Sequence, residues 1–184
     1  MKKLNQFITE KFRLSKDNIT QYKYYPRTIK ELKDILKKRL AKDKNANLND
    51  IDVSGMTTLS GAFFNLDPHN IDISEWDTSN VVDMFGVFWG CKNFNSDVSE
   101  WDVSNVENME NLFGYCEKFD SDLTNWNISK VTNITYMFIN CENFKCDLNH
   151  WDTSSIISDF RAFQGSALED NPPKWYKNIY TSTK

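Results

Sequence analysis

Acidic and amide side chains recur at two positions of a 25-residue period, and this arrangement could hold a charged partner. In each copy one of them precedes a tryptophan and the other follows it. If the tryptophan points inward from an extended segment, its two neighbours point outward. Stacked carboxylates would repel one another, and a basic peptide or a divalent cation would relieve that repulsion. The candidate partner-binding residues are Glu75, Asp77, Glu100, Asp102, Asn125, Asn127, His150 and Asp152.

A structural role would explain the recurring aspartates equally well. An aspartate at a turn can accept a hydrogen bond from a backbone N–H group two residues further on. Every repeat would need the same turn, so the residue type would recur even without a partner. A second column is expected to form turns before each extended segment, and it consists of Asp72, Asp97, Asp122 and Asp147.

One group of residues resembles a nucleophile, a base and an orienting acid, namely Cys146, His150 and Asp152. The repeat pattern argues against this chemistry. Asp152 belongs to a recurring column, and His150 occupies a position where other copies have acids or amides. The sequence also has neither cysteine pairs at the CxxC spacing of zinc sites nor a phosphate-binding glycine loop. We therefore predict no enzymatic activity, no catalytic residues, no bound metal and no cofactor.

A fixed period of 25 residues organises most of the chain. A period in this range is typical of repeat architectures in which each copy stacks on the previous one. Equivalent residues would then lie about 4.8 Å apart, and the aromatic and cysteine columns would form a continuous buried core. These columns are Trp76, Trp101, Trp126 and Trp151, then Cys91, Cys116 and Cys141, and finally Phe63, Phe88, Phe113, Phe138 and Phe163.

Each copy is predicted to contain a short strand, a capped turn, a short helix and a return loop. Leu123, Trp126 and Ile128 follow the rhythm of a strand, and the serine that follows is suited to cap a helical turn. The predicted fold class is α/β, a solenoid of about five 25-residue strand–turn–helix coils with a helical N-terminal cap. The apolar stripe that predicts the helix is Val106, Met109, Leu112, Phe113 and Cys116.

Two amphipathic helices are predicted before the repeats, the first of them within residues 1–15. The second begins after Thr28, a favourable N-cap that forms a capping box with Glu31, and it fades near Lys44. In the C-terminal region Trp175 and Tyr176 are expected to fold back over the final copy, with Tyr176 at the tryptophan position of the period. The predicted parts are a basic helical cap over residues 1–50, the repeats over 51–166, and a C-terminal cap and tail over 167–184.

The charges are unevenly distributed along the chain. Residues 1–45 carry fourteen Lys/Arg and five Asp/Glu, a net charge of +9, whereas residues 46–184 carry eight and twenty-one, a net charge of −13. Such asymmetry hints at an electrostatic partner. The basic segment either borders the acidic repeats as a cap or binds nucleic acid or another anionic surface. No apolar run is long enough to span a membrane, and no signal peptide is recognised, so a cytoplasmic location is expected unless a leader is missing.

The repeat WDVSNVENMENLFGYCEKF resembles the BspA-type leucine-rich repeats, in the 25-residue form found in many Mycoplasma lipoproteins and gut-bacterial proteins of unassigned function. The shared features are the W-D-x-S-x-V run, the F-x-x-C pair and the F-x-x-D-L that follows, and they extend from Ile51 to about Ser166. The resemblance implies a right-handed leucine-rich-repeat solenoid with a role in adhesion or protein binding. The expected function is therefore to bind a protein partner on the acidic, exposed sheet face of the solenoid, and this charge would suit a basic partner.

Overall fold

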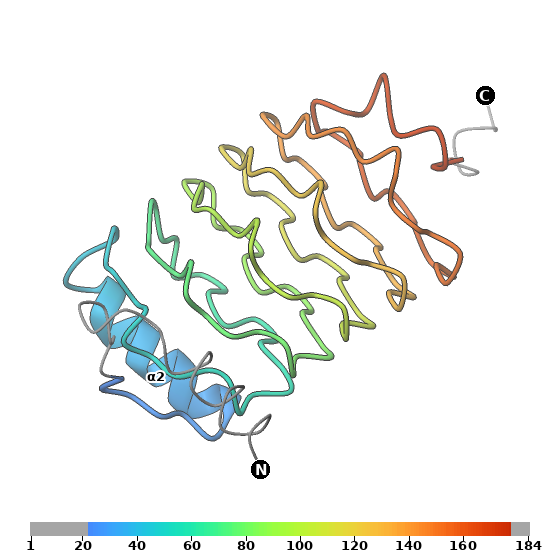
Figure 1. Cartoon of the computed structure of the whole chain (residues 1–184). Helices are drawn as coiled ribbons and strands as arrows, with labels where there is room; N and C mark the ends of the chain where they lie inside the picture. Colours follow the sequence, from blue (N-terminus) through green and yellow to red (C-terminus); the bar gives the residue numbers. More distant parts are fainter. Residues whose placement is uncertain (1–21, 178–184) are drawn as a thin grey trace, which may run out of the picture.

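The repeats lie side by side in an elongated stack, with a single helix at one end (Figure 1). This arrangement comes from a computed structural model that describes residues 22–177. The helix predicted within residues 1–15 lies outside this range. Inside the range, no helix is both long and apolar enough to cross a membrane.

The predicted α/β solenoid of strand–turn–helix coils is wrong. Over residues 22–177 the structure contains one helix, α2 (Ile29–Leu40), and no extended strand. The copies therefore contain neither the strand nor the helix of a leucine-rich repeat. They are joined by single parallel bridges between equivalent residues, which are Thr58–Asp83, Asp83–Asn108, Asn108–Asn133 and Asn133–Ser158, with two further bridges, Asn47–Asp72 and Tyr24–Ile51, nearer the N-terminus.

The segment that was expected to be helical cannot be a helix, because residues with positive φ interrupt it twice in every copy. A right-handed helix requires negative φ at each residue, and only glycine adopts the left-handed region at little cost. In the copy that starts at Trp101, Asn111 has φ 59° and Tyr115 has φ 62°. The equivalent residues are Gly61, Gly86, Tyr136 and Arg161 for the first position, and Asn65, Gly90, Asn140 and Gly165 for the second.

The backbone hydrogen bonds follow from these left-handed residues. The N–H groups of Asn111 and Phe113 donate to Thr135 O (2.9 Å) and Met137 O (3.0 Å) in the next copy. The intervening N–H of Leu112 donates within its own copy, to the carbonyl three residues earlier (3.2 Å). Alternate N–H groups thus point along the stack, which an α-helix does not allow because its donors bond within the helix. The apolar stripe predicted burial correctly but predicted the wrong backbone conformation.

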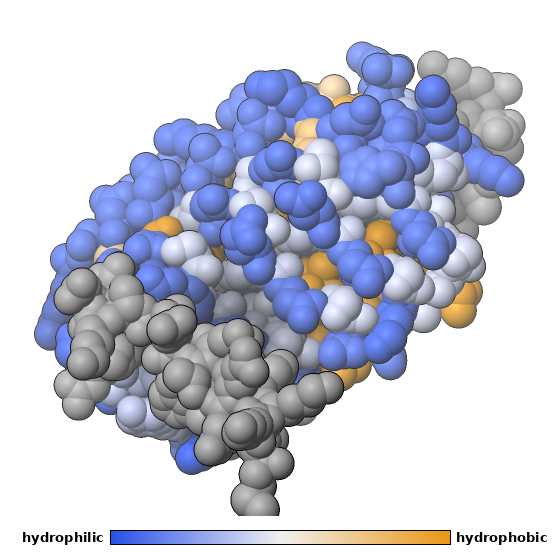
Figure 2. All heavy atoms as spheres, in the orientation of Figure 1, coloured by the Kyte–Doolittle hydropathy of each residue, from blue (hydrophilic) through white to orange (hydrophobic). Residues whose placement is uncertain are grey.

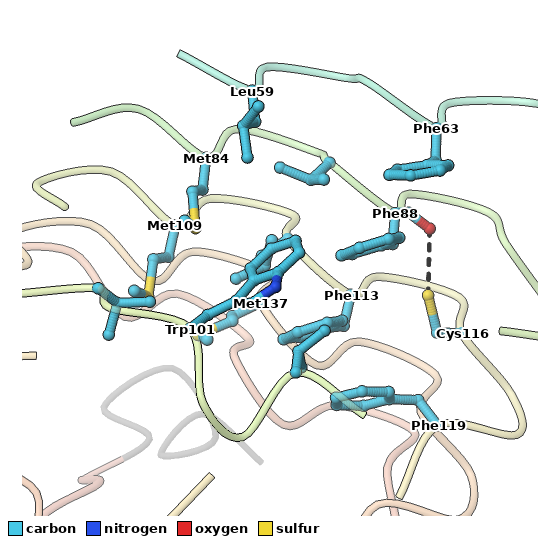
Figure 3. Close-up of a cluster of buried hydrophobic side chains, with 14 of the residues drawn as sticks. Leu59, Phe63, Met84, Phe88, Trp101, Met109, Phe113, Cys116, Phe119 and Met137 are labelled. Atoms are coloured by element: carbon cyan, nitrogen blue, oxygen red, sulfur yellow. Dashed lines mark hydrogen bonds between the residues drawn. The ribbon is translucent and has the colours of Figure 1, made fainter. Parts of the chain in front are cut away.

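Phenylalanines form the continuous centre of the core (Figure 3). Ring centroids are 5.0 Å apart between Phe63 and Phe88, and 5.6 Å apart between Phe88 and Phe113. The same column continues through Phe138 and Phe163 at spacings of 5.8 and 5.5 Å. Aromatic rings stacked in this way bury large areas and add an attraction beyond the buried area.

Tryptophan and cysteine also connect the copies through hydrogen bonds. The indole N–H of Trp101 donates to Ile73 O, 28 residues earlier in the chain, at 3.1 Å. The buried thiol of Cys116 donates to Phe88 O at 3.1 Å (Figure 3). The equivalent tryptophans and cysteines make the same bonds. Burial raises the pKa of the Cys91 thiol to about 12, so the cysteine column stays protonated and can donate. All four cysteines are free.

Helix α2 covers the N-terminal end of the stack. Thr28 caps the helix as predicted, since its hydroxyl accepts from the Glu31 N–H at 3.2 Å, and the helix ends at Leu40, earlier than expected. The side chains of Leu32, Leu36 and Leu40 on its inner face are buried.

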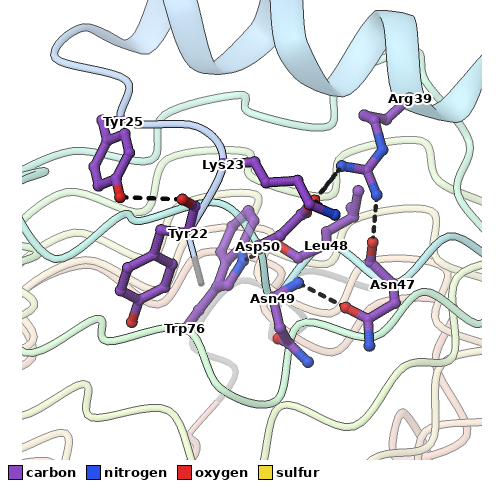
Figure 4. Close-up of polar contacts among 9 residues, drawn as sticks. All are labelled: Tyr22, Lys23, Tyr25, Arg39, Asn47, Leu48, Asn49, Asp50 and Trp76. Atoms are coloured by element: carbon purple, nitrogen blue, oxygen red, sulfur yellow. Dashed lines mark hydrogen bonds and ion pairs between the residues drawn. The ribbon is translucent and has the colours of Figure 1, made fainter. Parts of the chain in front are cut away.

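A pair of ionic contacts attaches α2 to the first copy. The Arg39 guanidinium donates to both carboxylate oxygens of Asp50, at 2.8 and 3.0 Å, and to Asn47 O at 2.7 Å (Figure 4). At the other end Trp175, rather than Tyr176, takes over the tryptophan role. Its indole donates to Leu148 O at 2.8 Å and stacks on Trp151.

Replacing Gly86 with alanine tests the left-handed backbone. Gly86 has φ +54°, where a Cβ costs about 1–2 kcal/mol, so Gly86→Ala should destabilise the protein by that amount. If Gly86 lay in a helix, Gly86→Ala would instead raise the free energy of unfolding by about 1 kcal/mol. The measurement is the free energy of unfolding in urea. Gly55→Ala is the control, because a Cβ at Gly55 would meet nothing within 4 Å.

Replacing Trp101 with phenylalanine tests the indole hydrogen bond between copies. Trp101→Phe should lower the free energy of unfolding by about 1 kcal/mol for the lost bond, and by more for the lost packing. Trp89→Phe is the matched control, because Trp89 is half-buried and its indole N–H makes no hydrogen bond within the described residues. Equal losses in the two variants would contradict the proposed role of the bond.

Candidate partner-binding face

The eight predicted site residues are all exposed, and they flank the buried tryptophans as expected. Asp77 and Asp102 are exposed, whereas Trp76 and Trp101 beside them are only 4% and 3% exposed. The same alternation holds for Asn127 in the next copy. We call these eight residues the acidic row. They are Glu75, Asp77, Glu100, Asp102, Asn125, Asn127, His150 and Asp152.

The acidic row does not lie on a β-sheet, which corrects the predicted sheet face. No bridge among the described residues joins these positions, since the repeat bridges lie further along each copy. Side chains join the copies here instead. Asn80 Nδ2 donates to Ser54 O at 2.8 Å, and Asn105 Nδ2 donates to Ser79 O at 2.8 Å. Hydrophilic residues also cover much of the surface seen in Figure 2.

The aspartates of the acidic row form turns. Asp77 Oδ1 accepts from the Ser79 N–H at 3.1 Å and from the Ser79 hydroxyl at 2.6 Å. Asp102 Oδ1 accepts from the Ser104 N–H at 3.0 Å. Asn127 replaces the carboxylate with an amide and makes the same bond, to the Ser129 N–H at 3.2 Å. The second column forms similar turns at Asp72, Asp97, Asp122 and Asp147.

These turns also keep two of the carboxyl groups ionised. Hydrogen bonds from the Ser104 hydroxyl and N–H lower the pKa of Asp102, and the Lys130 ammonium group adds to this effect. The same bonds from Ser154 lower the pKa of Asp152. Burial acts in the opposite direction and would raise these pKa values, so the hydrogen bonds outweigh it. Asp102 and Asp152 therefore carry a negative charge at neutral pH.

The residues that precede the tryptophans have different surroundings. The Glu75 N–H donates to Asn49 Oδ1 at 3.1 Å, and the His150 ring donates through Nε2 to Thr124 O at 2.5 Å. Tyr22 lies near the N-terminal end of the acidic row. Burial raises its pKa, and the nearby charges of Asp52, Asp77 and Glu75 raise it further.

The three residues that resemble a catalytic triad do not bond to one another. The Cys146 thiol contacts Asp122 Oδ1 at 3.6 Å, His150 bonds to Thr124 O, and Asp152 accepts from Ser154. Burial also raises the pKa of Cys146, which disfavours the nucleophilic thiolate. No three histidine, cysteine or acidic side chains come close enough to hold a metal ion in the part of the chain that the structure describes.

Part of the basic N-terminal segment serves the fold. Arg39 and Lys23 pair with Asp50, and Lys44 donates to Leu66 O. Lys37 and Lys38 on α2 are exposed and form no ion pair among residues 22–177.

An apolar pocket near α2 escaped the sequence analysis. Phe64, Phe85 and Trp89 line it together with Lys33, and its volume is about 460 Å³. The signal was present in the aligned copies, because Phe85 stands where other copies have Ser60, Glu110 and Thr135, and glycine occupies the next column at Gly61 and Gly86. The repeat pattern identifies residues that recur in every copy, whereas this pocket is lined by aromatic residues that do not recur in every copy.

The comparisons with known proteins give one match. The family described as "Mycoplasma protein of unknown function, DUF285" matches residues 57–175, which is more than half of the chain. No curated protein and no solved structure matches.

The lowered aspartate pKa values predict that acid destabilises the fold. Because the folded pKa values of Asp102 and Asp152 lie below the unfolded value, their contribution is present above about pH 4 and is lost as the pH falls further. Thermal unfolding at neutral pH and at about pH 3 measures this loss. Asp102→Asn and Asp152→Asn keep the turn acceptor, as Asn127 does, and should reduce the acid sensitivity. Unchanged sensitivity in the double variant would contradict the assignment.

Proposed function

We propose, from the premise that this chain belongs to the DUF285 family of Mycoplasma proteins of unknown function, that it binds a basic protein segment along the acidic row. The observation that carries this proposal is the regular exposure of the row. Equivalent side chains face solvent in four consecutive copies, and the tryptophans between them are buried.

The charge of the row supports a basic partner. Asp77, Asp102 and Asp152 each use Oδ1 for the turn, and Oδ2 accepts no hydrogen bond within the described residues. The free oxygens can accept hydrogen bonds from lysine or arginine side chains of a bound segment. Since repeat proteins commonly bind partners along extended surfaces, a segment lying along the stack would meet one copy after another.

The turns and the proposed binding are compatible with each other. A turn that fixes one carboxylate oxygen also fixes the direction of the side chain, so less conformational freedom is lost when a partner binds. The resemblance of the repeats to the BspA type supports the same class of function, because proteins of that type are commonly associated with adhesion and protein binding.

The competing candidate is the basic surface of α2, which would bind nucleic acid or another anionic surface. It is supported by Lys37 and Lys38, which are exposed and unpaired among the described residues. The acidic row is favoured because it spans four copies, whereas these lysines are two adjacent residues on one helix.

Charge removal on the acidic row tests the proposal. The probe is a fluorescein-labelled peptide of alternating glycine and lysine, and its anisotropy is measured with the full chain. Asp77→Asn together with Asp102→Asn should weaken binding about three- to tenfold while preserving the turns. Binding should also weaken as the ionic strength rises to about 0.15 M, where the screening length is about 8 Å.

Two controls separate the row from net charge and from the competing candidate. Glu142→Gln with Asp170→Asn removes the same charge at exposed positions outside the row, and it should have little effect. If both double variants weakened binding of the lysine peptide equally, the proposal would be wrong. Binding of a duplex DNA probe that is lost in Lys37→Gln with Lys38→Gln would favour the basic surface instead.

A further inference from the structure

A pocket of about 460 Å³ lies between α2 and the copies next to it, away from the acidic row. Lys33 reaches it from the helix, which lies at the end of the stack (Figure 1). Phe64, Phe85 and Trp89 contribute aromatic side chains from two successive copies. This volume falls within the range of about 300–1,000 Å³ that is typical of ligand pockets.

The pocket exists because two copies lack side chains that later copies have. Its lining includes Gly61 and Gly86, which belong to the column of left-handed residues. The same column carries Tyr136 and Arg161 further along the stack. There Tyr136 packs edge-on against Phe160 at 5.3 Å between centroids, and Arg161 lies over the same ring at 4.8 Å. Large side chains thus cover this surface in the later copies, and glycine leaves it open in the early ones.

Two of the aromatic walls are exposed, and the third is held in position by its neighbours. Phe64 is 50% exposed and Phe85 is 41% exposed, which is unusual for large apolar residues without a partner. The Trp89 ring lies against Gly114, where an added Cβ would come within 3.1 Å of it, and it also contacts the Tyr115 ring at 5.3 Å between centroids.

Lys33 gives the pocket a positive charge. Its ammonium nitrogen lies 3.1 Å from the place that a Cβ would occupy on Gly61. Among residues 22–177 no carboxylate forms an ion pair with it, whereas Lys30 on the same helix pairs with Asp34. An anionic group bound at the pocket would therefore meet an available cation that is already partly buried.

We propose that this pocket binds a protein segment that presents an aromatic side chain next to a carboxylate. The aromatic ring enters between Phe85 and Trp89, and the carboxylate pairs with Lys33. A side chain of a passing segment can enter because the walls are exposed. This partner has the opposite charge to the one proposed for the acidic row, so the pocket is a second and independent binding site.

Peptide titration into the full ¹⁵N-labelled chain tests the proposal. The probe is the capped tetrapeptide Gly-Phe-Asp-Gly, and the signals followed by NMR are the amides of Gly61 and Gly86 and the indole of Trp89. We expect saturable shifts in these signals. Gly-Phe-Asn-Gly should bind about fivefold more weakly, because it lacks the ion pair. Gly-Ala-Asp-Gly should bind at least about tenfold more weakly, because it lacks the ring.

Variants taken from other copies alter the pocket with residues that the stack already contains at the equivalent positions. Gly86→Asn introduces the residue that occupies the same column at Asn111, with φ 59°, and it should reduce Gly-Phe-Asp-Gly binding about tenfold. Phe85→Thr, which copies Thr135, removes one wall and gives a second route to the same result. The Lys33→Gln variant should bind Gly-Phe-Asp-Gly only as tightly as the unchanged chain binds Gly-Phe-Asn-Gly. The controls are Lys37→Gln on α2 and Tyr136→Asn in the column of left-handed residues, and both variants should bind Gly-Phe-Asp-Gly normally.

Several outcomes would overturn the proposal. The first is that folded Gly86→Asn and Phe85→Thr bind Gly-Phe-Asp-Gly as tightly as the unchanged chain does. The second is that the aspartate and asparagine peptides bind equally well. The third is that the full chain binds no peptide, because another segment or a second copy fills the pocket. Phenylacetate binding as tightly as the tetrapeptide would assign the pocket to a small molecule instead. None of these results would affect the acidic row, since the pocket variants should bind the lysine peptide normally.

Discussion

The direction of the backbone N–H groups is the constraint on which the rest of the structure depends. Left-handed residues at two positions of each copy turn alternate donors toward the next copy, as Asn111 and Tyr115 do. The donors between them close short turns within their own copy. Each copy therefore satisfies part of its backbone only through its neighbour, and a copy by itself would leave these groups without a protein partner. The stacking of Phe88 on Phe113 follows from this coupling, because equivalent side chains are brought into register.

Each copy is joined to its neighbour by backbone hydrogen bonds on one side and by side-chain hydrogen bonds on the other. Where backbone bonds join the copies, the side chains beside them are free to vary, and the glycines at Gly61 and Gly86 open a pocket. Where the indole of Trp101 and the amide of Asn105 join the copies, the polar residues between them must keep the turn. The acidic row lies on this second side. Its regularity therefore reflects the fold as well as any partner.

The ion pair between Arg39 and Asp50, which stabilises the fold, does not use the charged side chains of the two candidate surfaces. Arg39 is used to attach α2 to Asp50, a contact between partly buried groups that fixes the end of the stack. Lys33 is left without an ion pair in the described part of the chain and faces the pocket. Asp102 keeps its charge because Ser104 stabilises the ionised form. The molecule thus offers a negative row and a positively charged apolar pocket at separate places.

The sequence alone determined the register of the repeats, the burial of Trp101 and Cys116, the exposure of Asp102 and the cap at Thr28. Each of these depends on residue type and spacing, which the period displays directly. Only the tertiary structure decided the conformation between Val106 and Cys116. Apolar residues at steps of three and four residues predict a helix, yet in this fold the same stripe is buried by turns that contain left-handed residues. The choice was made by backbone bonds to the next copy, and no pattern within one copy contains that information.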